Sequence, residues 1–165
     1  MKLRTVLLPI LFAVGLAGCF LSDGPLIDPQ KAVFPYERIV YKEETSDDQL
    51  VLVHQGDAYL PSGRDSDANV GIRFLPVGDN LYLAEVKGVS DGKATYLHAI
   101  LAVDPDKKTA RSYAAVGDEK DAAPGLRACH DDICIDDVAA YVARAKAAIA
   151  AGGDPDAIYT IVEMK

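Results

Sequence analysis

Short runs of alternating apolar and polar residues fill the chain between residues 38 and 116. Apolar residues at every second position turn one face of a strand toward a core, which is typical of antiparallel sheets. Val70, Ile72 and Phe74, for example, share one face. The pattern predicts six strands in this part of the chain, at residues 38–42, 50–54, 70–76, 81–87, 95–103 and 109–115.

The connections between these runs are rich in residues that accept turn dihedral angles, as in Gly78-Asp79-Asn80 and Asp104-Pro105-Asp106. Neighbouring strands are therefore predicted to pair as hairpins and to form a meander. The run 95–103 is apolar on both faces. A strand of that kind is central, with other strands on one side and a helix or a barrel interior on the other.

One helix is predicted over residues 137–151, because its apolar residues fall on a single stripe. Asp136 is the expected N-cap, and Gly152 with Gly153 suits a left-handed end of the helix. Alternation over residues 157–164 predicts a last strand. The helical stripe consists of Val138, Tyr141, Val142, Ala145 and Ile149.

These elements predict an α+β fold made of a bent antiparallel β-meander of six to seven strands. One C-terminal helix is expected to pack on the meander, and a final short strand is expected to follow it. Residues 36–165 are predicted to form a single domain, because their number suits one hydrophobic core.

The beginning of the chain has the layout of an export signal. Lys2 and Arg4 precede an apolar run over residues 6–16, and small residues follow up to Gly18. At about 1.5 Å rise per residue the apolar run is shorter than the ~30 Å hydrocarbon core of a bilayer. Residues 1–18 are therefore expected to be a signal peptide that is cleaved.

The residues Leu16-Ala17-Gly18-Cys19 closely resemble the lipobox of bacterial lipoproteins. The resemblance covers only the leader, and it implies that Cys19 becomes the first residue of the mature chain and carries acyl chains such as palmitate. Each buried CH₂ contributes about 0.8 kcal/mol, so several chains make a lasting membrane anchor. The alternative is an ordinary signal peptide that leaves Cys19 free.

In that family an aspartate after the cysteine tends to retain the protein at the inner membrane. Phe20 occupies that position here, so the resemblance implies the periplasmic face of the outer membrane. Residues 19–35 are expected to form a lipid-anchored tether, because they contain three prolines and show no hydrophobic period.

Without residues 1–18 the chain keeps 15 basic and 25 acidic residues, a net charge of about −10. Such a surface repels the phosphates of nucleic acids and anionic lipid head groups. The expected partners are the membrane, through lipid on Cys19, and an envelope protein, and no nucleic acid is expected.

Cys129 and Cys134 remain after Cys19 is acylated, and an oxidising envelope compartment predicts a disulfide between them. The bond closes a short loop, so it stabilises the fold by only about 2 kcal/mol. The alternatives are a metal site that includes His130, or a redox dithiol. A structural zinc site uses four ligands and the redox motif is Cys-x-x-Cys, so neither a metal site nor a cofactor is predicted.

Two further motifs match functional sites only in part. Residues 88–92 have the letters of the G-x-S-x-G motif around Ser90, but a strand rather than a helix follows, which predicts a hairpin turn. Residues 65–69 begin like a calcium loop, but Val70 stands where the loop needs glycine, which predicts a polar loop. No catalytic residue is predicted, since the histidines are scattered at His54, His98 and His130.

Three functions follow from these patterns. The preferred one is a non-enzymatic binding or assembly protein, lipid-anchored in the cell envelope, because no nucleophile, base and orienting group converge. The alternative is a carrier of a small ligand or lipid, with a cavity in the β-sheet. The third is a hydrolase that uses Ser90 or a histidine, which the turn context of Ser90 disfavours.

Overall fold

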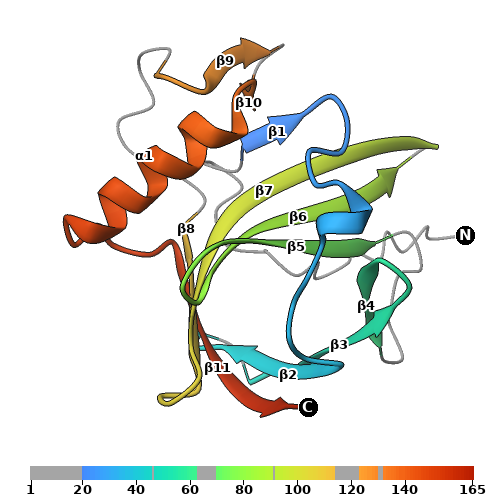
Figure 1. The fold of residues 1–165 in the computed structure, drawn as a ribbon. Helices are drawn as coiled ribbons and strands as arrows, with labels where there is room; N and C mark the ends of the chain where they lie inside the picture. The colour runs from blue at the N-terminus through green and yellow to red at the C-terminus, as the bar shows by residue number, and fades with distance from the viewer. Residues whose placement is uncertain (1–19, 46, 63–69, 91, 114–122, 130–131) are drawn as a thin grey trace, which may run out of the picture.

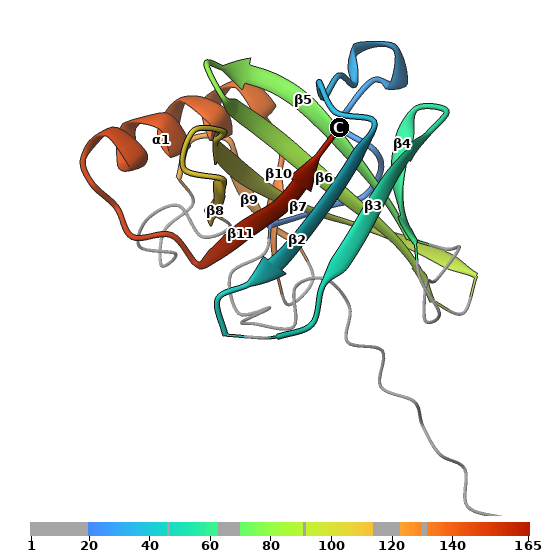
Figure 2. The same ribbon diagram turned by 90° about the horizontal axis from the view of Figure 1, so that it is seen from below.

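The computed structural model describes residues 20–45, 47–62, 70–90, 92–113, 123–129 and 132–165 (Figure 1). Eight antiparallel strands of the described chain close into a barrel (Figures 1 and 2). Their bounds are β2 Arg38–Glu43, β3 Leu50–Gln55, β4 Ala58–Ser62, β5 Gly71–Gly78, β6 Leu81–Ser90, β7 Lys93–Asp104, β8 Thr109–Tyr113 and β11 Ala157–Met164.

The last strand, β11, closes the barrel. It pairs with β8 on one edge, where Thr160 faces Thr109, and with β2 on the other, where Thr160 faces Lys42. The remaining neighbours follow in chain order, and the β6–β7 hairpin completes the ring. Each barrel strand therefore has a partner on both edges, which removes the open edges of a meander.

The predicted α+β meander is therefore wrong, although its strands are real. The six runs between residues 38 and 115 and the run 157–164 correspond to β2, β3, β5, β6, β7, β8 and β11. The pattern does not predict β4, which lies between β3 and β5 in the ring. The alternation of apolar and polar residues indicates which face of a strand is buried, but it does not indicate that the first and last barrel strands pair with each other.

Alternate side chains of the barrel strands point inward and form the main core. The register shows this on β5 and β6, where the facing pairs Ile72–Val86 and Phe74–Ala84 are buried inside the barrel. The residues between them, Arg73 and Glu85, also face each other and lie on the outer wall.

A second core lies outside the barrel and holds helix α1, Val138–Ala150 (Figure 1). Tyr141 and Ala145 of the helix are fully buried there, together with the outward-facing Leu83 and Ile100. The N-cap is Asp137 rather than the expected Asp136, since the Asp137 Oδ1 accepts the backbone N–H of Ala140 at 3.1 Å. No helix in the described ranges is long and apolar enough to cross a membrane.

Residues 20–35, expected to form a tether, pack against the barrel instead. Strand β1, Phe20–Ser22, pairs with β7 and with β10, and a 3-10 turn follows at Pro29–Lys31. Phe20 is 2 % exposed and Ile27 is 1 % exposed. Phe20 lies in a strand of only three residues and Ile27 lies on irregular backbone, so their burial leaves no periodic pattern in the sequence.

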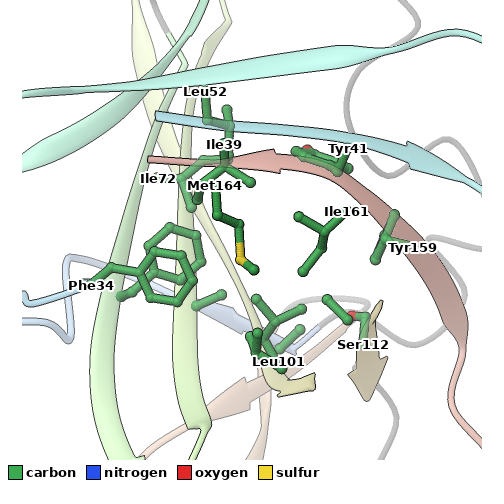
Figure 3. Close-up of a pocket in the computed structure, with 15 residues that line it drawn as sticks. Phe34, Ile39, Tyr41, Leu52, Ile72, Leu101, Ser112, Tyr159, Ile161 and Met164 are labelled. Atoms are coloured by element: carbon green, nitrogen blue, oxygen red, sulfur yellow. The ribbon is translucent and has the colours of Figure 1, made fainter. Parts of the chain in front are cut away.

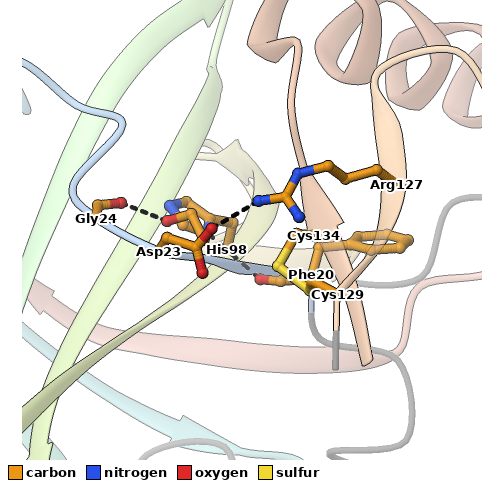
Figure 4. The surroundings of a disulfide bond; sticks show 8 residues. Phe20, Asp23, Gly24, His98, Arg127, Cys129 and Cys134 are labelled. Atoms are coloured by element: carbon orange, nitrogen blue, oxygen red, sulfur yellow. Dashed lines mark hydrogen bonds and ion pairs between the residues drawn. A yellow bond between two sulfur atoms is a disulfide. The ribbon is translucent and has the colours of Figure 1, made fainter. Parts of the chain in front are cut away.

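The structure contains the predicted disulfide between Cys129 and Cys134, with the two Cα atoms 5.7 Å apart (Figure 4). It joins the strands β9, Leu126–Cys129, and β10, Asp132–Ile135, of one hairpin. That hairpin lies beside β1, where Cys134 is the parallel partner of Leu21. An ion pair of 2.6 Å between Arg127 and Asp23 adds a second link between the hairpin and the N-terminal segment.

Candidate ligand-binding cavity

The interior of the barrel holds a cavity of about 60 Å³ (Figure 3). Its wall comes from the inner faces of β2, β3, β5, β6, β7, β8 and β11 and from Phe34, which precedes the first barrel strand. The lining residues include no Asp, Glu, Lys, Arg or His. They are Phe34, Ile39, Tyr41, Leu52, Ile72, Phe74, Ala84, Ala99, Leu101, Val103, Ala110, Ser112, Tyr159, Ile161 and Met164.

Phe34 closes one side of the cavity as the centre of an aromatic cluster. Its ring stacks on Phe74 with the centroids 4.3 Å apart and meets Tyr82 edge-on at 4.6 Å. The backbone around Phe34 is fixed as well, because Val33 donates its N–H to the carbonyl of Phe74 at 2.9 Å. The Tyr59 hydroxyl donates to the carbonyl oxygen of Phe34 at 3.1 Å.

Tyr59 has its pKa raised to about 12, because its burial disfavours the charged phenolate and the nearby Glu37 and Tyr82 add to the effect. The Tyr59 hydroxyl therefore keeps its proton at all ordinary pH values. Since it donates that proton to a carbonyl of the segment that carries Phe34, the segment stays fixed to the barrel over the same range.

Hydroxyl-bearing side chains gather on the other side of the cavity. Tyr41 and Tyr159 meet edge-on with their ring centroids 5.4 Å apart. On the neighbouring pair of strands Tyr159 faces Ala110 and Ala157 faces Ser112, so Tyr159 and Ser112 are diagonal neighbours on the inner wall. Figure 3 shows Tyr41, Tyr159 and Ser112 together, on the side opposite Phe34.

A separate polar cluster lies on the outer wall, under the N-terminal segment. Glu85 and His98 face each other across β6 and β7, and both side chains are at most 1 % exposed. The Glu85 Oε2 accepts the backbone N–H groups of Leu26 and Ile27 at 2.5 and 3.2 Å. The same oxygen lies 3.2 Å from the His98 Nε2, while the His98 Nδ1 lies 3.3 Å from the carbonyl oxygen of Phe20.

Both ring nitrogens of His98 therefore face oxygen atoms, the Nε2 the Glu85 carboxylate and the Nδ1 the Phe20 carbonyl. Burial raises the pKa of Glu85, but the hydrogen bonds from His98, Leu26 and Ile27 outweigh burial and lower the pKa overall.

An ion-pair chain continues outward from this cluster. The Arg73 Nη1 lies 3.6 Å from the Glu85 Oε1, and the Arg73 Nη2 lies 2.5 Å from the Asp57 Oδ2. Asp57 is 45 % exposed, so the chain runs from solvent to the buried pair. The cluster faces away from the cavity and clamps residues 20–27 to the barrel, which indicates a structural role.

Those motif residues that lie in the described part of the chain are in different parts of the fold. Ser90 faces Lys93 across the β6–β7 turn, as predicted for a hairpin. His54 lies in β3 with its ring centroid 5.0 Å from that of Tyr59, whereas His98 is on the outer wall. His130 and residues 65–69 lie outside the described residues. The described part of the chain contains no group of three or more residues suited to a metal ion.

No protein-family model, no curated protein and no solved structure matches this chain. A closed barrel with an apolar interior is compatible with ligand binding or transport of a ligand.

Proposed function

We propose that the barrel binds a small apolar ligand in its interior, which makes the protein a binding or carrier protein rather than an enzyme. The cavity of about 60 Å³ is the observation that supports this function. Protein interiors are close-packed, with few voids larger than a water molecule. At about 24 cal/mol per Å³, an empty void of this size costs the fold about 1.4 kcal/mol, which a bound apolar ligand would offset.

The size of the cavity restricts the ligand. Pockets for drug-sized ligands usually enclose about 300–1,000 Å³, and an apolar cavity of about 150 Å³ is enough for benzene. The cavity of about 60 Å³ is therefore smaller than one that holds benzene, and a chain of several carbons needs Phe34 or Met164 to move. Phe34 can move without breaking a strand, because it lies outside the barrel ladder.

Filling the cavity is expected to remove the ligand. Ala84 is 5 % exposed and lines the cavity, so Ala84→Leu places a larger apolar side chain where the ligand would lie. Native mass spectrometry of the protein extracted gently from its own membranes should show a separable small mass on the wild type and none on Ala84→Leu.

The matched control is Ala94→Leu, which makes the same change at an exposed position of β7. It should keep the small mass. If the wild type carries no small mass, or if Ala84→Leu carries it as fully as the wild type, the ligand does not lie in the barrel.

We also propose that acyl chains on Cys19 hold the barrel at the outer membrane, on its periplasmic side. The lipobox-like residues Leu16-Ala17-Gly18-Cys19 support the anchor. The buried Phe20 follows Cys19 directly and pairs with His98 of β7. Since one residue spans at most about 3.6 Å, such an anchor would place the barrel against the bilayer, without a tether.

Acylation is tested by growing the host with an alkyne analogue of palmitate. The wild type should incorporate the label, and Cys19→Ser should lose it completely, because no other residue carries the lipobox pattern. The double variant Cys129→Ala, Cys134→Ala removes the other two cysteines and should stay labelled. Equal labelling of Cys19→Ser and the wild type would rule out this anchor.

A further inference from the structure

The two sides of the cavity differ in chemistry. Phe34 and Phe74 form an aromatic wall on one side, while Tyr41 and Ser112 bring hydroxyl groups to the other (Figure 3). Ser112 is 1 % exposed, a burial that is uncommon for a serine. A ligand that is apolar throughout would leave the hydroxyl side unmatched, whereas a ligand with one polar end would match both sides.

The cavity also disfavours charge. Its lining contains no basic side chain that would pair with an anion and no acidic one that would pair with a cation. An ionised carboxylate in such surroundings loses its hydration without gaining a partner, which is far costlier than the burial of a hydroxyl. The pKa of Tyr41 is raised well above its ordinary value by burial, then by Tyr159 and Glu43, so a negative charge is already disfavoured at this side.

Resting on the proposed function, we infer that the ligand is an uncharged single-chain molecule with one hydrogen-bonding oxygen. Its oxygen lies at Tyr41 and Ser112, and its chain runs toward Phe34. A straight-chain alcohol has this chemistry, whereas a fatty-acid anion of the same length does not. The interior of a closed barrel of eight strands is just wide enough to be filled by side chains or to hold one small ligand.

Three probes with the same number of carbon atoms separate the contributions that the apolar chain, the oxygen and the charge make to the binding affinity. Hexane, hexan-1-ol and hexanoate, which all need Phe34 or Met164 to move, are titrated into the folded protein at pH 7.5. Binding is followed by methyl NMR shifts of Ile72, Ile161 and Met164, which line the cavity. Hexan-1-ol is expected to bind more tightly than hexane. Hexanoate should bind at least about 10-fold more weakly than hexan-1-ol, because its charge has no partner.

Two variants locate the oxygen. Tyr41→Phe and Ser112→Ala should each weaken hexan-1-ol binding by roughly 2–10-fold, the effect of one hydrogen bond, and should leave hexane binding unchanged. Tyr113→Phe is the matched control, because it removes a hydroxyl from a buried tyrosine of the outer core. It should change neither affinity.

The outcomes distinguish the two proposals. If hexane and hexan-1-ol bind equally and the variants change nothing, the ligand class is wrong and the apolar site remains. Hexanoate that binds as tightly as hexan-1-ol also overturns the ligand class. If none of the three probes shifts the methyl signals, the interior is a packed core, and the proposed function falls together with this inference.

Discussion

Replacing Glu85 with alanine is expected to lower the free energy of unfolding by about 3–5 kcal/mol, the cost of breaking a buried ion pair by removing one partner. The change leaves the His98 ring and the N–H groups of Leu26 and Ile27 without the carboxylate, and it removes the partner of Arg73. Urea unfolding at pH 7 measures the loss. The matched control is Asp57→Ala at the exposed end of the same ion-pair chain, which should cost less than about 1 kcal/mol.

The same carboxyl predicts a dependence on pH. Because the folded state lowers the pKa of Glu85, its contribution is complete above the unfolded pKa of about 4.3 and is lost as the pH falls through the lower folded value. Wild-type stability should therefore decline more steeply below about pH 4.5 than that of Glu85→Gln. If the stabilities of the wild type and Glu85→Gln decline in parallel below about pH 4.5, the pair of Glu85 and His98 does not hold the N-terminal segment. The same conclusion follows if Glu85→Ala lowers the free energy of unfolding by less than about 1 kcal/mol at pH 7.

The local patterns of the sequence predict individual strands well, because each strand needs only its own alternation. The run 157–164 coincides with β11. What they do not predict is the partner of each strand. β11 meets β2 more than 100 residues earlier in the chain, and no local pattern encodes that pairing. The missing β4 has a local reason, since Pro61 lacks the N–H that a strand uses in its ladder.

The candidate site is predictable only in part for the same reason. Alternation places Ile72 and Phe74 on an inner face, but the cavity exists only because the ring closes around them. The cluster of Glu85 and His98 is harder still to predict. Both residues sit among apolar neighbours on their strands, yet the segment that buries them comes from residues 20–27 and shows no periodic pattern.

Phe34 limits the size of the cavity, because its ring lines the cavity and stacks on Phe74. Replacing it with alanine is expected to cost about 3 kcal/mol of stability, the lower end of the range for such a truncation, because Phe34 is only partly buried. The same change opens room for a longer chain. Decan-1-ol has four CH₂ groups more than hexan-1-ol, worth about 0.8 kcal/mol each when buried.

Decan-1-ol should therefore bind Phe34→Ala roughly 200-fold more tightly than it binds the wild type, as measured by isothermal titration calorimetry. The affinity for hexan-1-ol should rise less, because its chain has four fewer CH₂ groups to bury in the space that Phe34 leaves. The neighbouring Val33→Ala is the control, because Val33 is 57 % exposed and lines no part of the cavity. Equal decan-1-ol affinities in the wild type and Phe34→Ala would show that the chain does not extend toward Phe34, and the direction assigned to the ligand would have to be reversed.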